Sequence, residues 1–216
     1  MRAVRIHAPG GPDALAVEAS NLAPLPAAID YIRGAALAMP GLTAWQALFD
    51  HAGLRPGQTL LVHGAAGAVG DMAVQLARDA GASVIGTGRE GDRAAVLDAG
   101  AERFAALDTE RFEETAGQVD VVLDLIGGDV QDRSAAVVRP GGTLISVVAP
   151  PKVRPPGIRA MYFVVEPNRG QLAELGRRAQ RGRLTPKVGA VHPLAETRDA
   201  FLHKQHTSGK TIIQVI

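Results

Sequence analysis

The middle of the chain alternates short apolar runs with stretches of helical periodicity. The apolar runs are continuous, which is typical of parallel strands that helices cover on both faces. Repeated strand–helix–strand units predict an α/β protein with a doubly wound parallel sheet, the Rossmann arrangement. The predicted strands are 59–63, 83–86, 103–105, 119–125, 143–148 and 161–165, and the predicted helices are 69–80, 93–99, 111–115, 129–137 and 169–181.

Both ends of the chain lie outside this alternating block. We expect them to join in a small β-sheet of their own, because each carries strand-like segments separated by turn residues. Ahead of the block, Pro40 and Gly41 predict a turn, and Thr43 is the expected cap of the helix that follows it. The terminal elements are a hairpin from 2–7 and 15–18, an extended segment at 187–191, a helix at 193–204 and a strand at 211–216.

Composition narrows the function classes. The 23 Lys and Arg residues balance 22 Asp and Glu residues, so we expect no nucleic acid or membrane partner. The sequence has no cysteine, which excludes disulfides, thiol nucleophiles and thiolate zinc ligands. Its histidines show no metal-ligand spacing, so no metal is expected. No apolar run approaches the roughly 18 residues of a membrane span, and the start does not resemble a signal peptide, which favours a cytoplasmic protein.

A glycine-rich loop follows the first strand of the block and opens its first helix. In the run from His63 to Gly70, Gly64 permits a tight turn, Gly67 lets backbone amides approach a phosphate, and Gly70 lets the helix pack closely on the sheet. The spacing G-x-x-G-x-x-G is not specific by itself, and a glycine-rich connection without a ligand is the alternative. The strand before it and the helix after it favour a site for the pyrophosphate of a dinucleotide.

The second strand ends at Gly86-Thr87-Gly88-Arg89, where NAD-binding proteins usually carry an acid for the ribose hydroxyls. Arg89, with Arg93 a turn later, is suited to a 2′-phosphate, so the sequence favours NADPH. Glu90 and Asp92 lie close by and oppose this interpretation. A solvated loop charge is the alternative for Arg89.

Five segments together resemble the zinc-independent medium-chain dehydrogenases/reductases of the quinone oxidoreductase type. They span 40–48, 62–70, 119–128, 139–144 and 209–213, in the order found in that family. The resemblance implies an NADPH-dependent reductase of quinones or α,β-unsaturated carbonyls, usually a homodimer joined through the edge of the nucleotide-domain sheet. It also implies a GroES-like substrate domain, of which residues 1–25 and 187–216 form a remnant beside a dinucleotide-binding domain at 26–186.

The resemblance also assigns cofactor contacts. Thr43 is expected near the nicotinamide, the glycine loop at the pyrophosphate, the end of the second strand at the adenosine phosphate, and Lys210 at the cofactor from the tail. The expected contacts are Thr43, Gly64, Ala65, Ala66, Gly67, Ala68, Val69, Gly86, Thr87, Gly88, Arg89, Ile126, Gly127, Val148, Ala149, Phe163, Val165 and Lys210.

Other residues keep two interpretations. His63 either touches the cofactor or is a hydrogen-bonded core histidine, and Asp124 is either a ligand-binding acid or a cap for the loop after its strand. Tyr162 is a weak candidate proton donor, and the arginines at 177–183 are most simply a solvated helix face. At the level of function, the alternative to a reductase is a dinucleotide-binding scaffold, or a cyclase or isomerase, that no longer transfers hydride.

Overall fold

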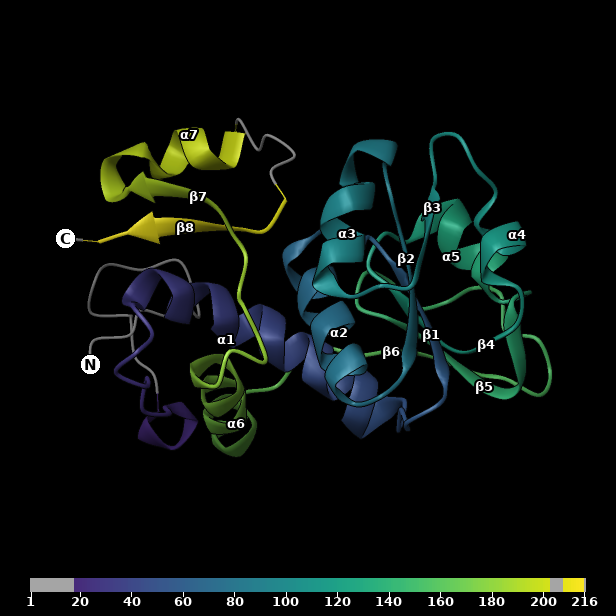
Figure 1. Ribbon diagram of the computed structural model, residues 1–216, viewed down its shortest axis with the longest axis horizontal. Coiled ribbons are helices and arrows are strands. Elements are labelled where there is room, and N and C mark those ends of the chain that lie inside the picture. The colour runs from purple at the N-terminus through teal and green to yellow at the C-terminus, as the bar shows by residue number, and fades with distance from the viewer. Residues whose placement is uncertain (1–17, 203–207, 216) are drawn as a thin grey trace.

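The computed structural model describes residues 18–202 and 208–215, and a six-stranded parallel sheet forms its centre. The strand order is β3-β2-β1-β4-β5-β6, so the chain adds β2 and β3 on one side of β1 and then β4, β5 and β6 on the other. Every neighbouring pair is parallel, and the predicted doubly wound α/β fold is therefore confirmed (Figure 1). Of the hairpin predicted from 2–7 and 15–18, all but residue 18 lies outside the described residues. The strands are β1 (Thr59–His63), β2 (Ser83–Gly88), β3 (Arg103–Ala106), β4 (Val119–Asp124), β5 (Val138–Ser146) and β6 (Arg159–Tyr162).

Helices cover both faces of this sheet. Along β1, Leu60 and Val62 point into the larger core, under α1, α2, α3 and α6, while Leu61 points into the smaller core, under α4 and α5. All three side chains are fully buried, as expected for a strand covered on both sides. The helices are α1 (Tyr31–Trp45), α2 (Ala68–Asp79), α3 (Arg93–Ala99), α4 (Phe112–Ala116), α5 (Gly128–Ser134) and α6 (Arg169–Gln180).

The predicted turn at Pro40 and helix cap at Thr43 are wrong. Asp30 caps α1 by accepting a hydrogen bond from the Arg33 amide at 2.7 Å, and the helix runs through Pro40 into a π-helical segment, η3 (Gln46–His51). Thr43 instead donates to the Met39 carbonyl at 2.8 Å from within the helix. A proline costs one helical hydrogen bond, and the packing of α1 against α2 and α6 outweighs that cost.

Two predicted boundaries are also wrong because of tertiary contacts. The strand predicted at 161–165 ends at Tyr162, since the side chain of Gln46 bonds both the amide and the carbonyl of Glu166 and draws the chain away from the sheet. The helix predicted at 129–137 ends at Ser134, because the Val137 carbonyl accepts from the Val119 amide at 2.9 Å and joins the sheet.

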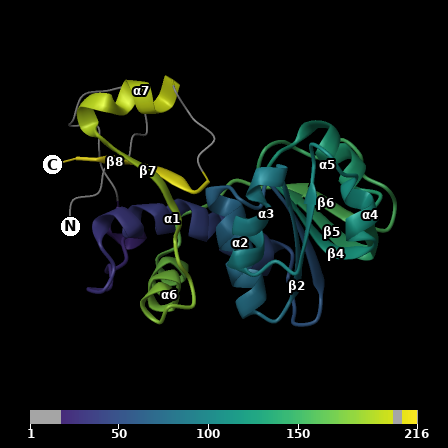
Figure 2. The same cartoon turned by 45° about the horizontal axis from the view of Figure 1, so that its top comes forward.

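A second, two-stranded parallel sheet consists of β7 (Val188–Pro193) and β8 (Lys210–Gln214), with η5 (Leu194–Glu196) and α7 (Thr197–Leu202) between them. Figures 1 and 2 show it beside α1, away from the large sheet. Within β7 and β8 only Ile212 is buried. In the described parts of the chain, no helix combines the length and apolar character needed to cross a membrane.

Candidate functional site

A cleft of about 680 Å³ opens at the carboxyl ends of β1, β2 and β4. This is the edge at which doubly wound sheets bind ligands, next to the strand where the order reverses. Its volume suits a small-molecule ligand. The lining residues are Gly64, Ala66, Gly67, Gly88, Arg89, Asp92, Leu107, Asp108, Leu125, Ile126 and Ser208.

The glycine loop forms one wall of the cleft. The Gly67 amide donates to the Gly64 carbonyl at 3.1 Å, and Gly64 has φ +73°, so the loop turns sharply into α2. A Cβ on Gly70 would lie 2.3 Å from the Gly64 carbonyl oxygen and 2.7 Å from the Ala65 Cα, which means that α2 can approach β1 only without a side chain there.

Gly67 is the N-cap of α2 and has no side chain to bond the first helical amides. Those amides have no acceptor within their own helix, and the helix dipole adds partial positive charge at the same end. The loop therefore has the geometry and the charge to hold an anion such as a pyrophosphate.

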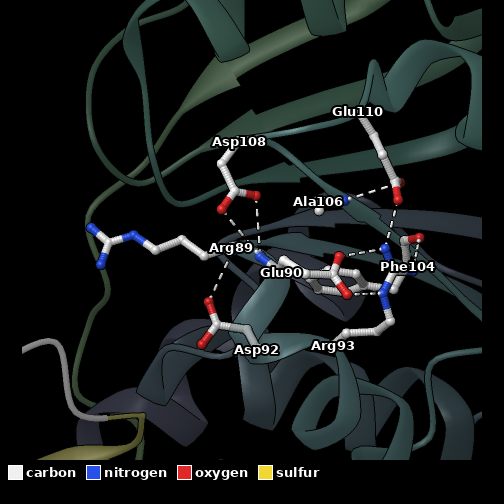
Figure 3. A network of polar contacts seen from close by, with 8 residues as sticks. All are labelled: Arg89, Glu90, Asp92, Arg93, Phe104, Ala106, Asp108 and Glu110. Carbon is white, nitrogen blue, oxygen red and sulfur yellow. Dashed lines mark hydrogen bonds and ion pairs between the residues drawn. The ribbon is translucent and has the colours of Figure 1, made fainter.

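A network of charged side chains lies beyond the end of β2, beside the cleft (Figure 3). The guanidinium of Arg93 binds Glu90 at 2.7 Å, Glu110 at 2.6 Å and the Phe104 carbonyl at 3.1 Å, and it lies 5.0 Å from the centre of the Phe104 ring. The two carboxylates raise the pKa of Arg93, and the hydrogen bond from Arg93 lowers the pKa of Glu90. Arg93 thus holds α3 to the end of β3 and does not line the cleft.

Arg89 and two carboxylates share the same end of the cleft. Asp92 accepts a hydrogen bond from the Arg89 amide at 3.0 Å, and Asp108 accepts one from the Glu90 amide at 3.1 Å. Figure 3 shows the Arg89 side chain extending away from the Arg93 ion pairs. A negatively charged group bound here would meet one arginine and two acids.

At the other end of the cleft, Asp124 organises the loop after β4. One carboxylate oxygen accepts from the amides of Ile126 and Gly127 at 3.0 and 2.8 Å, and the other accepts from Gln131 and Ser146, both at 2.8 Å. Asp124 is fully buried, so it is the cap for its loop. This places Ile126 on the wall of the cleft.

His63 is fully buried at the end of β1. Its Nδ1 lies 2.9 Å from the Thr87 hydroxyl and its Nε2 lies 2.8 Å from the Ser134 hydroxyl. Burial lowers the pKa of His63 to about 4, although the neighbouring Asp124 carboxylate acts to raise it. Of its two interpretations, the hydrogen-bonded core histidine is the one that the structure supports.

Several predicted contacts do not line the cleft. Ala65, Thr87 and Thr43 are buried, and Phe163 lines a separate cavity of about 430 Å³ with Gln46, Asp50 and His51. The contact of these residues with a cofactor stays a prediction. The full set outside the cleft is Thr43, Ala65, Ala68, Val69, Gly86, Thr87, Gly127, Val148, Ala149, Phe163, Val165 and Lys210, and the candidate proton donor Tyr162 is also outside it.

Five lining residues were not among the predicted contacts: Asp92, noted only as an acid close to Arg89, and Leu107, Asp108, Leu125 and Ser208. Leu107 and Asp108 follow β3, Leu125 follows β4, and Ser208 precedes β8. Leu107, Asp108 and Leu125 could have been found from the rule that ligands lie beyond the carboxyl ends of the strands. Ser208 had no signal, because it reaches the cleft from the small sheet.

Two further features of the sequence concern metal binding and the arginines at 177–183. Among residues 18–202 and 208–215, no group of three or more metal-ligating side chains comes together. In the arginine-rich segment, Arg177 and Arg178 both pair with Glu174, and Arg178 also binds Asp79 at 2.6 Å and lies 5.0 Å from the centre of the Trp45 ring.

A parallel sheet in this strand order, with a glycine-rich turn from β1 into α2 at the mouth of a cleft, defines a protein of the Rossmann type. The family of zinc-binding dehydrogenases matches residues 96–213. The chain belongs to this family, within the medium-chain dehydrogenases/reductases. Oxidoreductases of that group use nicotinamide cofactors.

Relatives support this assignment. A probable mitochondrial zinc-binding oxidoreductase of Arthroderma benhamiae is 30% identical over 91% of this chain and 66% of its own length. The quinone oxidoreductase of Rattus norvegicus is 30% identical over 93% of this chain and 67% of its own. The solved quinone oxidoreductase of Coxiella burnetii superposes with a TM-score of 0.78, at 30% identity, over 87% of this chain and 62% of that one. The chain thus spans about two thirds of these relatives.

Proposed function

We propose that this chain binds NADPH and transfers its hydride to a quinone or to the activated double bond of an α,β-unsaturated carbonyl. The observation that carries the proposal is the cleft, which joins the glycine loop, the start of α2 and the carboxyl ends of three strands. Relatives named quinone oxidoreductase support the reaction class. We place the protein in the cytoplasm, with a small-molecule substrate and no zinc.

The residues present fit a dinucleotide. The first amides of α2 would bind the pyrophosphate, and Arg89 would bind the 2′-phosphate at the other side of Gly88. Ile126, held by Asp124, would lie beside the nicotinamide ribose and keep water away from it. Bound NADPH would supply the hydride, and hydrogen bonds would polarise the carbonyl of the acceptor.

The residues present do not fit a catalytic zinc. The sequence has no cysteine, and the described residues gather no donor set. We therefore propose a zinc-independent reductase. We further propose a homodimer through β6, because β6 ends the large sheet and its outer edge pairs with no strand among the residues that the structure describes.

The preference for NADPH depends on Arg89. Replacing it (Arg89→Ala) should weaken NADPH binding by about tenfold or more and leave NADH binding within about twofold, because a charge-assisted bond to the 2′-phosphate contributes about 1.5–3 kcal/mol. Titration of cofactor fluorescence measures both constants. Arg55→Ala is the matched control, since Arg55 is an exposed cation that does not line the cleft. An equal loss for both cofactors would contradict the assignment.

The first test of the proposal as a whole is an NADPH titration followed by turnover with a simple quinone. Binding with turnover supports the reductase. Binding without turnover contradicts hydride transfer and favours a dinucleotide-binding scaffold. If neither NADPH nor NADH binds, the cleft is not a nicotinamide site.

A further inference from the structure

The segment before β8 crosses the glycine loop. The Ser208 hydroxyl donates a hydrogen bond to the Ala66 carbonyl at 2.9 Å, across 142 residues of sequence. Gly209 forms a parallel β-bridge with Gly67, and Ser208 also lines the cleft. The small sheet and the glycine loop are therefore joined at the mouth of the cleft.

The contact fixes one peptide plane from both sides. The peptide between Ala66 and Gly67 accepts from Ser208 through its carbonyl, and its N–H donates to the Gly64 carbonyl at 3.1 Å. This peptide ends at Gly67, the N-cap residue directly before Ala68, where α2 begins. Its orientation therefore determines where the first helical amides point, and it decides whether a carbonyl oxygen faces a bound anion.

Ser208 is itself held from the other side. The Lys210 amide donates to the Lys187 carbonyl at 2.8 Å. Gly209 has φ +100°, and a Cβ there would lie 2.8 Å from that carbonyl oxygen and 3.0 Å from the Gly189 nitrogen. Only glycine lets the chain pass between β7 and the loop, so the position of Ser208 is set by backbone contacts.

We propose that Ser208 is a positioning residue of the cofactor site: its hydroxyl orients the Ala66–Gly67 peptide so that the amides of α2 meet the pyrophosphate. This inference rests on the proposed function. It adds a residue from the small sheet to a site otherwise built by the large one. Ser208 acts through the loop and need not touch the cofactor.

The test compares two ligands that occupy different lengths of the cleft. NADPH has a pyrophosphate, whereas adenosine 2′-monophosphate occupies only the adenosine end of the cleft. Ser208→Ala should weaken NADPH binding by about fivefold, the equivalent of one ordinary hydrogen bond, and leave the monophosphate within about twofold. Ser208→Thr, which keeps the hydroxyl, should restore most of the NADPH affinity. Calorimetric titration measures each constant.

Thr197→Ala is the matched control. Thr197 also donates a hydroxyl to a backbone carbonyl, that of Leu194 at 2.6 Å, between the same two strands but outside the cleft. It should change neither affinity. Unchanged NADPH binding in Ser208→Ala would overturn the inference, and so would an equal loss for both ligands, which would indicate general disruption of the cleft. If the unaltered chain binds no nicotinamide nucleotide, the proposed function fails and the inference fails with it.

Discussion

At the scale of single residues, His63 shows how a polar group can be both buried and stabilising. Hydroxyls of Thr87 and Ser134 satisfy both ring nitrogens, and the ring of Phe112 packs against the imidazole edge-on at 4.7 Å. Burial removes the water that would otherwise stabilise a protonated, charged imidazole. The folded state therefore favours the neutral form, which is why the pKa falls.

This gives a pH dependence of stability. The folded pKa of about 4 is below the ordinary histidine value of 6.5, so the stabilisation is complete above about pH 6.5 and is lost as the pH falls towards 4. The depression corresponds to roughly 3 kcal/mol in the free energy of unfolding. Over that interval, the free energy of unfolding of His63→Asn should fall less than that of the unaltered chain. Urea titrations at pH 7.5, 5.5 and 4.5 measure the difference. Parallel curves for the two proteins would contradict the assignment.

At the scale of elements, the junction of β1 and α2 depends on two glycines for different reasons. Gly70 has backbone atoms where a Cβ would lie, whereas Gly67 has φ −71° and only the Gly64 carbonyl oxygen, at 3.3 Å, near that point. The first position is required for packing. The second needs only a small shift of the Gly64 carbonyl to admit a Cβ, and it is exposed at the mouth of the cleft.

The two substitutions should therefore separate stability from binding. Gly70→Ala should lower the free energy of unfolding by about 3 kcal/mol, because the backbone must move to admit a methyl group. Gly67→Ala should lose much less stability than Gly70→Ala and bind NADPH about tenfold more weakly, since the methyl group would crowd the pyrophosphate. Thermal unfolding and cofactor titration measure the pair. Equal melting temperatures for both variants would be the contrary result.

Sequence patterns predicted the elements whose partners are close in the chain. The apolar runs of β1, β2 and β4, and the helix from Arg93 to Ala99, came from local periodicity. One error arose where a distant group intervenes, since Gln46 ends β6 by bonding Glu166 from 120 residues away. The misplaced cap of α1 is a local error, because Asp30 bonds the amide of Arg33, three residues on.

The same distinction holds for the cleft. Gly64, Gly67 and Arg89 were predicted because a motif places them directly after strands. The binding of Arg93 to Glu110 could not be predicted from spacing, because α3 must first dock beside β3. Ser208 depends on the path of the small sheet, for which no local pattern exists.

At the scale of the whole molecule, the two sheets differ in how much they bury. β1 and β4 are almost entirely buried, while β7 and β8 bury only Ile212. Local opening is easiest where few apolar contacts resist it. The small sheet should therefore open more often than the large one.

Hydrogen exchange measured by mass spectrometry tests this difference. Amides of β7 and β8 should exchange at least about a hundredfold faster than those of β1 and β4, which corresponds to a gap of about 2.7 kcal/mol in opening free energy. Added NADPH should slow exchange in the glycine loop and at Ser208–Gly209 together. Protection confined to the loop would show that the two sheets respond separately.

The bridge between Gly67 and Gly209 also has a consequence for synthesis on the ribosome. The glycine loop is translated 142 residues before the serine that orients it. At 5–20 residues per second, roughly seven to thirty seconds pass before this partner is made. Over that interval the nascent chain can complete its large sheet, while the glycine loop still lacks the hydrogen bond from Ser208. Maturation of the binding site is therefore a late event, which follows synthesis of the large sheet.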